Sequence, residues 1–251
     1  MTRAWRIRMF WAAALLFAAV FTLACTGLPH FGTASHPYGA RAVAASLDRR
    51  TSNVVSSINF DQRAFDTLGE ESILFGSVLG AIALLRLARD EREHPAEPAR
   101  VPAATRLLGT ALLPVALLTG VYVIAHGQLS PGGGFQGGVV LATGLHLAYV
   151  AADYRALKRV RPLAVLDVAD AVAAGAFAAL GLVGLAAGAG YLANTAPLGT
   201  FNQLSSGGLV PVVNAVVGVE VGSGLVVLLA TFLDQAVEID ATPQTDQEKR
   251  P

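Results

Sequence analysis

Acidic side chains inside apolar stretches are the residues of this chain that could carry chemistry. Glu220 is the one ionisable residue between Leu204 and Asp234, and it lies near the middle of an apolar segment. A carboxylate at bilayer depth must face protein, water or a partner charge, so Glu220 is a candidate for handling protons or cations. The alternative is a neutral glutamic acid that joins helices through hydrogen bonds. We expect Asn214, six residues earlier, to make a separate polar contact.

A second acidic group, Asp66, Glu70 and Glu71, precedes a short uncharged stretch at 72–85. As a helix this stretch spans about 21 Å, less than the roughly 30 Å of bilayer hydrocarbon. Glu70 and Glu71 are therefore expected near the outer hydrocarbon edge, where a carboxylate is costly unless it is protonated, paired or hydrated. The alternative is a capped helix start, with Asp66 or Thr67 as N-cap and Glu70 near the positive end of the dipole.

Two histidines and two aspartates also lie in or beside apolar segments. His146 and His126 could relay protons or form interhelical hydrogen bonds. Asp167 and Asp170 open an apolar segment beside a basic cluster, which predicts local charge pairing. Cys25 is the only cysteine, and no Cys/His spacing indicates a metal site. The sequence contains no cofactor motif, and we expect no cofactor.

A glycine-rich segment at 131–138 separates two apolar stretches. Such a run makes a poor helix or strand by itself, so backbone must approach a partner closely there, or a helix must begin there and present its N–H groups. Pairs of glycines four residues apart favour close helix packing. The segment consists of Pro131, Gly132, Gly133, Gly134, Phe135, Gln136, Gly137 and Gly138. The glycine pairs are Gly133/Gly137, Gly134/Gly138, Gly76/Gly80, Gly184/Gly188 and Gly218/Gly222.

Composition indicates an integral membrane protein. Of the 251 residues, 53% are hydrophobic and 14% are charged, and the formal net charge is zero, which gives no argument for nucleic-acid binding. Apolar stretches long enough to span a bilayer predict an all-α polytopic protein with six transmembrane helices. The predicted spans are 8–27, 68–89, 106–126, 134–152, 167–190 and 210–233.

Basic residues predict that both termini are cytoplasmic. Of the 18 Arg and Lys residues, 14 lie before the first span, around 86–106, around 155–161 and in the tail, whereas the loops at 127–133 and 191–209 contain none. The other four, Arg41, Arg49, Arg50 and Arg63, lie in the first loop. The first span could instead be a cleaved signal peptide. Its removal would leave the orientation of the other five spans unchanged.

A polar, proline-containing stretch at 90–105 predicts a cytoplasmic linker. It divides a two-span module at 1–89 from a four-span module at 106–238, which a cytoplasmic tail at 239–251 follows.

The segment from His126 to Gly138 resembles the signature of the B subunit of Mrp- or Mnh-type multisubunit cation/proton antiporters. The resemblance covers about residues 104–238, the four-span module. It implies an accessory subunit that exchanges Na⁺ and H⁺ together with large A and D subunits and small membrane subunits, in the cytoplasmic membrane of a prokaryote.

The first module resembles the C-terminal tail of the A subunit of the same antiporters, a piece that is also found in membrane-bound hydrogenases. The resemblance rests on 51–55 (Thr-Ser-Asn-Val-Val) and 65–70 (Phe-Asp-Thr-Leu-Gly-Glu). Ala64 replaces a usual glycine, and Glu71 stands where an apolar residue is usual. Glu70 is the matching carboxylate, and Glu71 leaves open which of the two faces the protein interior.

The resemblance therefore implies a transporter subunit rather than an enzyme. The candidates for an ion or proton path are Glu70, Asp66, Glu220 and His146. Two alternatives stay open: a purely structural membrane subunit, and a membrane-arm subunit of a redox-driven complex such as a membrane-bound hydrogenase.

Overall fold

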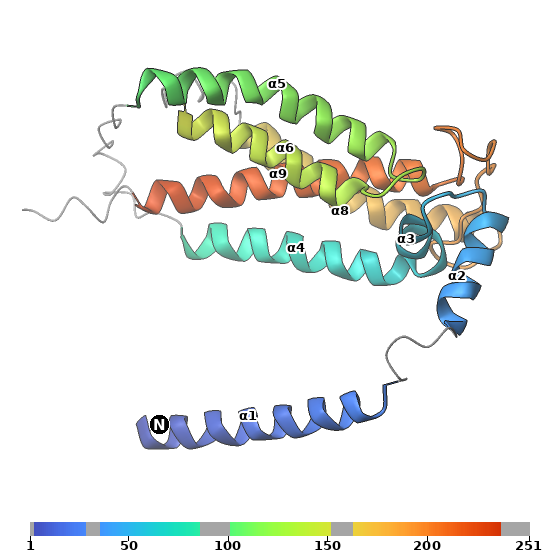
Figure 1. Ribbon diagram of the computed structural model, residues 1–251, viewed down its shortest axis with the longest axis horizontal. Coiled ribbons are helices and arrows are strands. Elements are labelled where there is room, and N and C mark those ends of the chain that lie inside the picture. Colours follow the sequence, from blue (N-terminus) through green and yellow to red (C-terminus); the bar gives the residue numbers. More distant parts are fainter. Residues whose placement is uncertain (1–2, 29–35, 86–100, 152–162, 237–251) are drawn as a thin grey trace, which may run out of the picture. The chain divides into compact units, whose positions relative to one another are not determined.

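The computed structural model describes residues 3–28, 36–85, 101–151 and 163–236 (Figure 1). Every regular element in these ranges is a helix. In chain order the helices are α1 (Arg3–Thr26), α2 (Pro37–Asp48), α3 (Val54–Ser57), the π-helical turn η1 (Ile58–Gln62), α4 (Ala64–Leu84), α5 (Ala103–Ala125), α6 (Gly134–Ala151), α8 (Leu163–Ala186) and α9 (Val210–Ala236).

The predicted all-α membrane fold is confirmed. Five described helices, α1, α4, α5, α8 and α9, are long and apolar enough to cross a membrane. The fourth predicted span, 134–152, corresponds to α6, a helix of 18 residues that is not among these five. The count of six spans and the cytoplasmic termini stay predictions.

The chain divides into two compact units, residues 1–41 and 42–251. The first unit contains α1, and the second contains the helix bundle with α4 to α9. The boundary therefore does not fall at the predicted linker, most of which lies outside the described residues, as does the predicted tail. The two predicted modules rest on sequence resemblance and stay a prediction.

Helix α9 is the centre of the bundle in the second unit. It packs against α4, α5, α6 and α8, and α5 packs against α6 (Figure 1). In α9, 61% of the 18-residue apolar stretch that could span a membrane is buried inside the protein. The corresponding share is 28% or less in the other four candidate spans. A helix that is surrounded in this way must be apolar on all sides, which agrees with its sequence.

Glycines bring α6 and α9 into backbone contact. A Cβ atom added to Gly134 would lie 2.4 Å from the Asn214 carbonyl oxygen and 3.0 Å from the Gly218 nitrogen. One added to Gly138 would lie 2.9 Å from both the Gly218 oxygen and the Gly222 nitrogen. The packing interpretation of these glycine pairs is therefore right at this crossing.

The other glycine pairs behave differently. Around Gly76 and Gly80 of α4 there is no atom within 4 Å of an added Cβ, so this pair does not mediate a helix contact among the described residues. Gly184 packs instead against the loop that follows its own helix, where an added Cβ would lie 2.3 Å from the Gly190 oxygen. The spacing of glycines indicated possible contact surfaces, and helix orientation decided which of them are used.

We predict that Gly134→Ala destabilises the bundle. The added methyl group would collide with backbone atoms of α9, which cannot rotate away, so we expect a cost of about 1–3 kcal/mol. The measurement is the midpoint of thermal unfolding of the purified chain in detergent. Gly80→Ala is the matched control, because open space surrounds that position. Equal midpoints for the two variants would contradict the close crossing.

Candidate functional site

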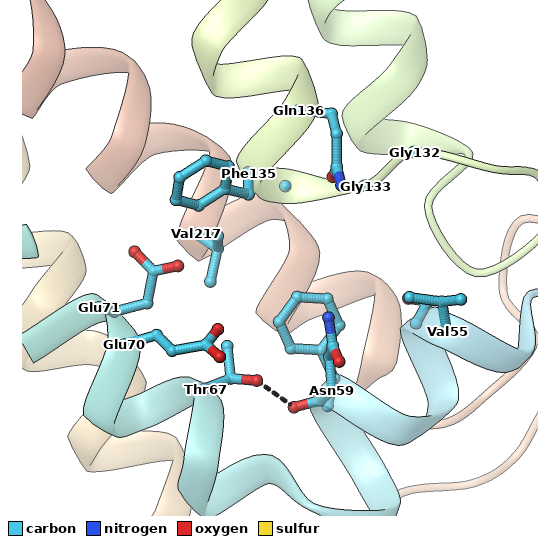
Figure 2. Close-up of a pocket in the computed structure, with 13 residues that line it drawn as sticks. Val55, Asn59, Thr67, Glu70, Glu71, Gly132, Gly133, Phe135, Gln136 and Val217 are labelled. Carbon is cyan, nitrogen blue, oxygen red and sulfur yellow. Dashed lines mark hydrogen bonds between the residues drawn. The ribbon is translucent and has the colours of Figure 1, made fainter. Parts of the chain in front are cut away.

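A polar pocket of about 220 Å³ lies at the end of the bundle where α4 and α9 begin (Figure 2). One wall comes from α3, η1 and α4, and the other comes from the glycine-rich segment and α9. The lining residues are Val55, Ser56, Asn59, Phe60, Thr67, Glu70, Glu71, Gly132, Gly133, Gly134, Phe135, Gln136 and Val217. The two sequence segments with the most specific patterns therefore meet at one site.

Glu70 and Glu71 both line this pocket, yet they differ in burial. Glu71 is 2% exposed, whereas Glu70 is exposed. Glu71 shares the buried stripe of α4 with Thr67 and Val78, because residues three, four and seven apart lie on one helix face. Glu71 thus faces the interior of this chain, and Glu70 lies at the rim of the pocket.

The alternative reading of a capped helix start is wrong. Helix α4 begins at Ala64, and its N-cap, Arg63, makes no side-chain capping bond. Asp66 forms an exposed ion pair with Arg63. Thr67 donates its hydroxyl proton to the Asn59 carbonyl oxygen at 2.7 Å, which ties α4 to η1 beside the pocket (Figure 2).

Glu220 lies fully buried, at 0% exposure, in the middle of α9. Neither of its carboxylate oxygens has a hydrogen-bond partner among the described residues. A glutamic acid that joins helices would need such a partner, so the structure gives that alternative no support. An unpartnered carboxyl group at this depth must hold a proton, meet a cation or meet water.

Asp170 of α8, for which the sequence predicted local charge pairing, is a buried acid. It is 2% exposed, and its Oδ1 has no hydrogen-bond partner in the described part of the chain. It shares its helix stripe with Ala173 and Phe177, which are also buried. This spacing of three and seven residues was the available signal. The basic cluster expected to pair with it, around 155–161, lies outside the described residues.

The two histidines have local partners. His146 Nδ1 lies 2.7 Å from the Ala142 carbonyl oxygen one turn earlier in α6. His126 Nδ1 lies 2.9 Å from the Tyr122 carbonyl oxygen, and the two rings stack with centroids 3.9 Å apart. These contacts lie within one helix or at its end.

Asn214 holds the start of α6 against α9. Its Oδ1 accepts the Gly134 N–H at 2.8 Å, and its Nδ2 donates to Ser56 Oγ at 3.0 Å. Asn214 is fully buried, and it makes the separate polar contact that its spacing from Glu220 indicated. The first N–H group of α6 is therefore taken by the protein itself rather than offered to an anion.

Positive backbone angles explain two of the glycines in the pocket wall. Gly132 and Gly133 have φ angles of 118° and 146°, a region that side chains disfavour. A Cβ added to Gly133 would also lie 2.6 Å from Asn214 Oδ1. Pro131 and these two glycines thus turn the chain from α5 into α6.

Comparison with known proteins shows what the second part of the chain is similar to. Residues 104–227 match the family described as a domain related to the MnhB subunit of Na⁺/H⁺ antiporters. We call residues 104–227 the MnhB-related domain after this similarity. This family match covers α5, α6, α8 and most of α9, and with them one wall of the pocket.

Similar proteins extend beyond that domain. An uncharacterized protein of Methanocaldococcus jannaschii is 26% identical over 202 residues, which is 69% of this chain and 74% of that protein. A chain of the membrane-bound sulfane sulfur reductase, an archaeal respiratory membrane complex, is 26% identical with a TM-score of 0.68. That match covers 91% of this chain and 98% of the other.

A third similarity is to a chain of the Mrp complex from Dietzia sp. DQ12-45-1b. It is 22% identical, has a TM-score of 0.67, and covers 99% of this chain but 27% of the other. At this identity the match shows a shared fold. Together the comparisons support a multi-pass membrane subunit of Mrp-type, antiporter-like complexes, among whose relatives are respiratory membrane complexes.

Asn53 connects the MnhB-related domain to the segment before it. Its Nδ2 donates to the carbonyl oxygens of Gly127 at 2.7 Å and Ser130 at 2.8 Å. Its Oδ1 accepts the N–H groups of Val55 and Ser56 and so caps α3. One side chain thereby fixes α3 against the turn that leads into the glycine-rich segment, and this fixes both walls of the pocket.

A second connection lies outside the membrane-spanning helices. Arg49 Nε lies 3.8 Å from Asp61 Oδ2, and Arg49 Nη1 donates to the Asn194 carbonyl oxygen at 3.1 Å. Burial raises the pKa of Asp61 above its ordinary value, although the Arg49 charge and a hydrogen bond from Asn194 oppose this shift. The contact holds η1, and with it the start of α4, against the 191–209 loop.

We predict that Asn214→Ala loosens the pocket wall. The change leaves the buried Gly134 N–H without its acceptor, which costs about 1–3 kcal/mol. The measurement is thermal unfolding in detergent, with limited proteolysis at 127–133 as a local readout. Gln203→Ala, at an exposed position in the 191–209 loop, is the control. Unchanged unfolding and proteolysis would show that Asn214 does not hold α6.

Proposed function

We propose that this chain is a non-enzymatic membrane subunit of a multisubunit antiporter in the cytoplasmic membrane of a prokaryote. The complex exchanges cytoplasmic Na⁺ for external H⁺, and this chain contributes both to its assembly and to an ion path. Its partners are large A- and D-type subunits and small membrane subunits. In this arrangement both termini face the cytoplasm, and the pocket opens toward the outer side.

Glu220 is the observation that carries the proposal. A subunit that only sealed a complex would gain nothing from a fully buried carboxyl group without hydrogen-bond partners among the described residues. Such a group costs stability that an apolar side chain would not cost. Its retention is explained if it takes up and releases a proton, or holds a cation, during each transport cycle.

The pocket supports an outer entrance to the same path. Glu70 lies at its rim and Glu71 in its wall, so a proton that arrives from outside meets an exposed carboxylate before a buried one. At the pocket end, the loops at 127–133 and 191–209 contain no Lys or Arg, and the longer first loop contains four of the 18, which favours the outer side for this end. Asp66 and His146 stay weaker candidates, because each already has a local partner.

A second candidate function is a membrane-arm subunit of a redox-driven complex. It is favoured by the match to a chain of the sulfane sulfur reductase complex, which covers nearly all of both chains. Purification of the native complex separates the two functions. Co-purifying subunits with bound iron and acid-labile sulfide would support the redox complex, and antiporter subunits alone would support the proposal.

We predict that Glu220→Gln lowers Na⁺/H⁺ exchange at least tenfold, because glutamine fills the same space but cannot exchange a proton. The measurement is Na⁺-induced collapse of a respiration-generated ΔpH in inverted vesicles that contain the whole complex, at matched amounts of assembled complex. Asp48→Asn, an exposed acid-to-amide change at the end of α2, is the control.

Normal exchange by the Glu220→Gln complex would instead support a purely structural subunit. A lack of exchange by the unmodified complex would reject the antiporter function as a whole.

A further inference from the structure

Three helices of the bundle each place one buried carboxyl group toward the same interior region. These are Glu71 of α4, Asp170 of α8 and Glu220 of α9, and none is more than 2% exposed. Each has at least one carboxylate oxygen without a hydrogen-bond partner among the described residues.

The three groups lie at successive depths. At a rise of 1.5 Å per residue, Glu71 is about 10 Å and Glu220 about 15 Å from the starts of α4 and α9 at the pocket end. Asp170 is about 24 Å from the end of α8 on that same side. The carboxyl groups therefore follow one another from the pocket toward the opposite end of the bundle.

Packing places Asp170 beside α9, one turn beyond Glu220. A Cβ atom added to Gly224 would lie 3.0 Å from Asp170 Oδ1 and 3.4 Å from Val78 Cγ2. Gly224 follows Glu220 by four residues, so both lie on one face of α9. Val78 follows Glu71 by seven residues on the buried stripe of α4. Helices α4, α8 and α9 thus meet at this point.

The acids lie close enough to interact electrostatically. The charges of Glu70, Glu220 and Asp170 act on Glu71, the charge of Asp170 acts on Glu220, and the charge of Asp167 acts on Asp170. The first and last members, Glu70 and Asp167, are exposed. A line of carboxyl groups therefore runs from the rim of the pocket, through the buried set, to an exposed acid near the other end of α8.

We propose that Glu71, Glu220 and Asp170 form a proton-conducting series through this subunit, entered from the pocket beneath the glycine-rich segment. The inference rests on the proposed antiporter function and assigns its proton route within the chain. In each step the O–H bond of one carboxylic acid breaks, and its proton passes through water to a neighbouring carboxylate, where a new O–H bond forms. The donor then accepts the next proton.

Mutual repulsion makes such a series suited to protons. Neighbouring carboxylates do not all ionise at once in a low-dielectric interior, so most hold a proton and a single vacancy can move along the line. The pocket, at about 220 Å³, has room for several waters. Na⁺ fits less well, because hard cations require several oxygen ligands around one point.

The test compares Glu71→Gln, Asp170→Asn and the double variant in the whole complex, with Na⁺-induced ΔpH collapse measured at matched complex amounts. Carboxyl groups in series give a distinctive result. Each single variant should lose at least tenfold in exchange rate, and the double variant should fall little further, because one break already interrupts the line. Asp48→Asn again serves as the control.

The possible outcomes distinguish failure of the proton-conducting series from failure of the proposed antiporter function. Normal exchange by Asp170→Asn, with an active unmodified complex, would overturn the series and leave the antiporter function standing. Losses that multiply in the double variant would indicate independent sites and would also overturn it. An inactive unmodified complex would reject the function itself.

A chemical readout covers the case in which a variant fails to assemble. Dicyclohexylcarbodiimide modifies protonated carboxyl groups in apolar surroundings, and mass spectrometry of the unmodified complex locates the adducts. We expect adducts at Glu220 and Asp170 that accumulate in proportion to the loss of exchange. Absence of adducts at both residues would overturn the proposal. Protection of Asp170 by Na⁺ in the absence of a ΔpH would overturn the assignment to protons in favour of a Na⁺ site.

Discussion

Backbone contact between α6 and α9 is the constraint on which the rest of this structure depends. Gly134 and Gly138 of α6 lie directly against Gly218 and Gly222 of α9. With no Cβ atoms between them, the two helices approach closely enough for the Asn214 side chain to accept the Gly134 N–H. That bond fixes where α6 starts, and therefore where the glycine-rich segment forms a wall of the pocket.

Close packing also explains the chemistry of α9. Because α4, α5, α6 and α8 all contact this helix, Glu220 lies in the interior of the protein rather than against lipid. Dispersion contacts and small residues hold such a bundle together in a membrane, where helices gain little from the hydrophobic effect. Polar groups add to this cohesion only where they find hydrogen-bond partners, as Asn214 does. An unpartnered carboxyl group in the bundle interior therefore indicates a functional role.

The segment before the MnhB-related domain packs against it and is hydrogen-bonded to it. Asn53 bridges α3 and the turn before the glycine-rich segment, and α4 packs against α8 and α9. Glu71 from this segment and Glu220 from the domain consequently belong to one electrostatic system. Residues on both sides of the boundary at 104 thus line one pocket and surround these buried acids. Neither part could enclose the carboxyl groups alone, because α4 and α9 each cover only one side of them.

The sequence by itself determined the membrane class, the approximate helix positions, the buried Glu220 and the importance of the glycine-rich segment. These follow from local properties, since hydrophobic length and residue composition are encoded within each helix. The tertiary structure alone decided that Glu71 rather than Glu70 faces the interior, and that Asp170 joins Glu220. Neighbouring residues differ by about 100° around a helix, so the rotation of α4 and α8 against α9 selects which carboxylate is buried. The same rotation leaves Gly76 and Gly80 open while Gly134 and Gly138 are in contact. Glycine pairs with the same spacing therefore pack against another helix in α6 and face open space in α4. The difference arises because partners distant along the chain set the orientation of each helix.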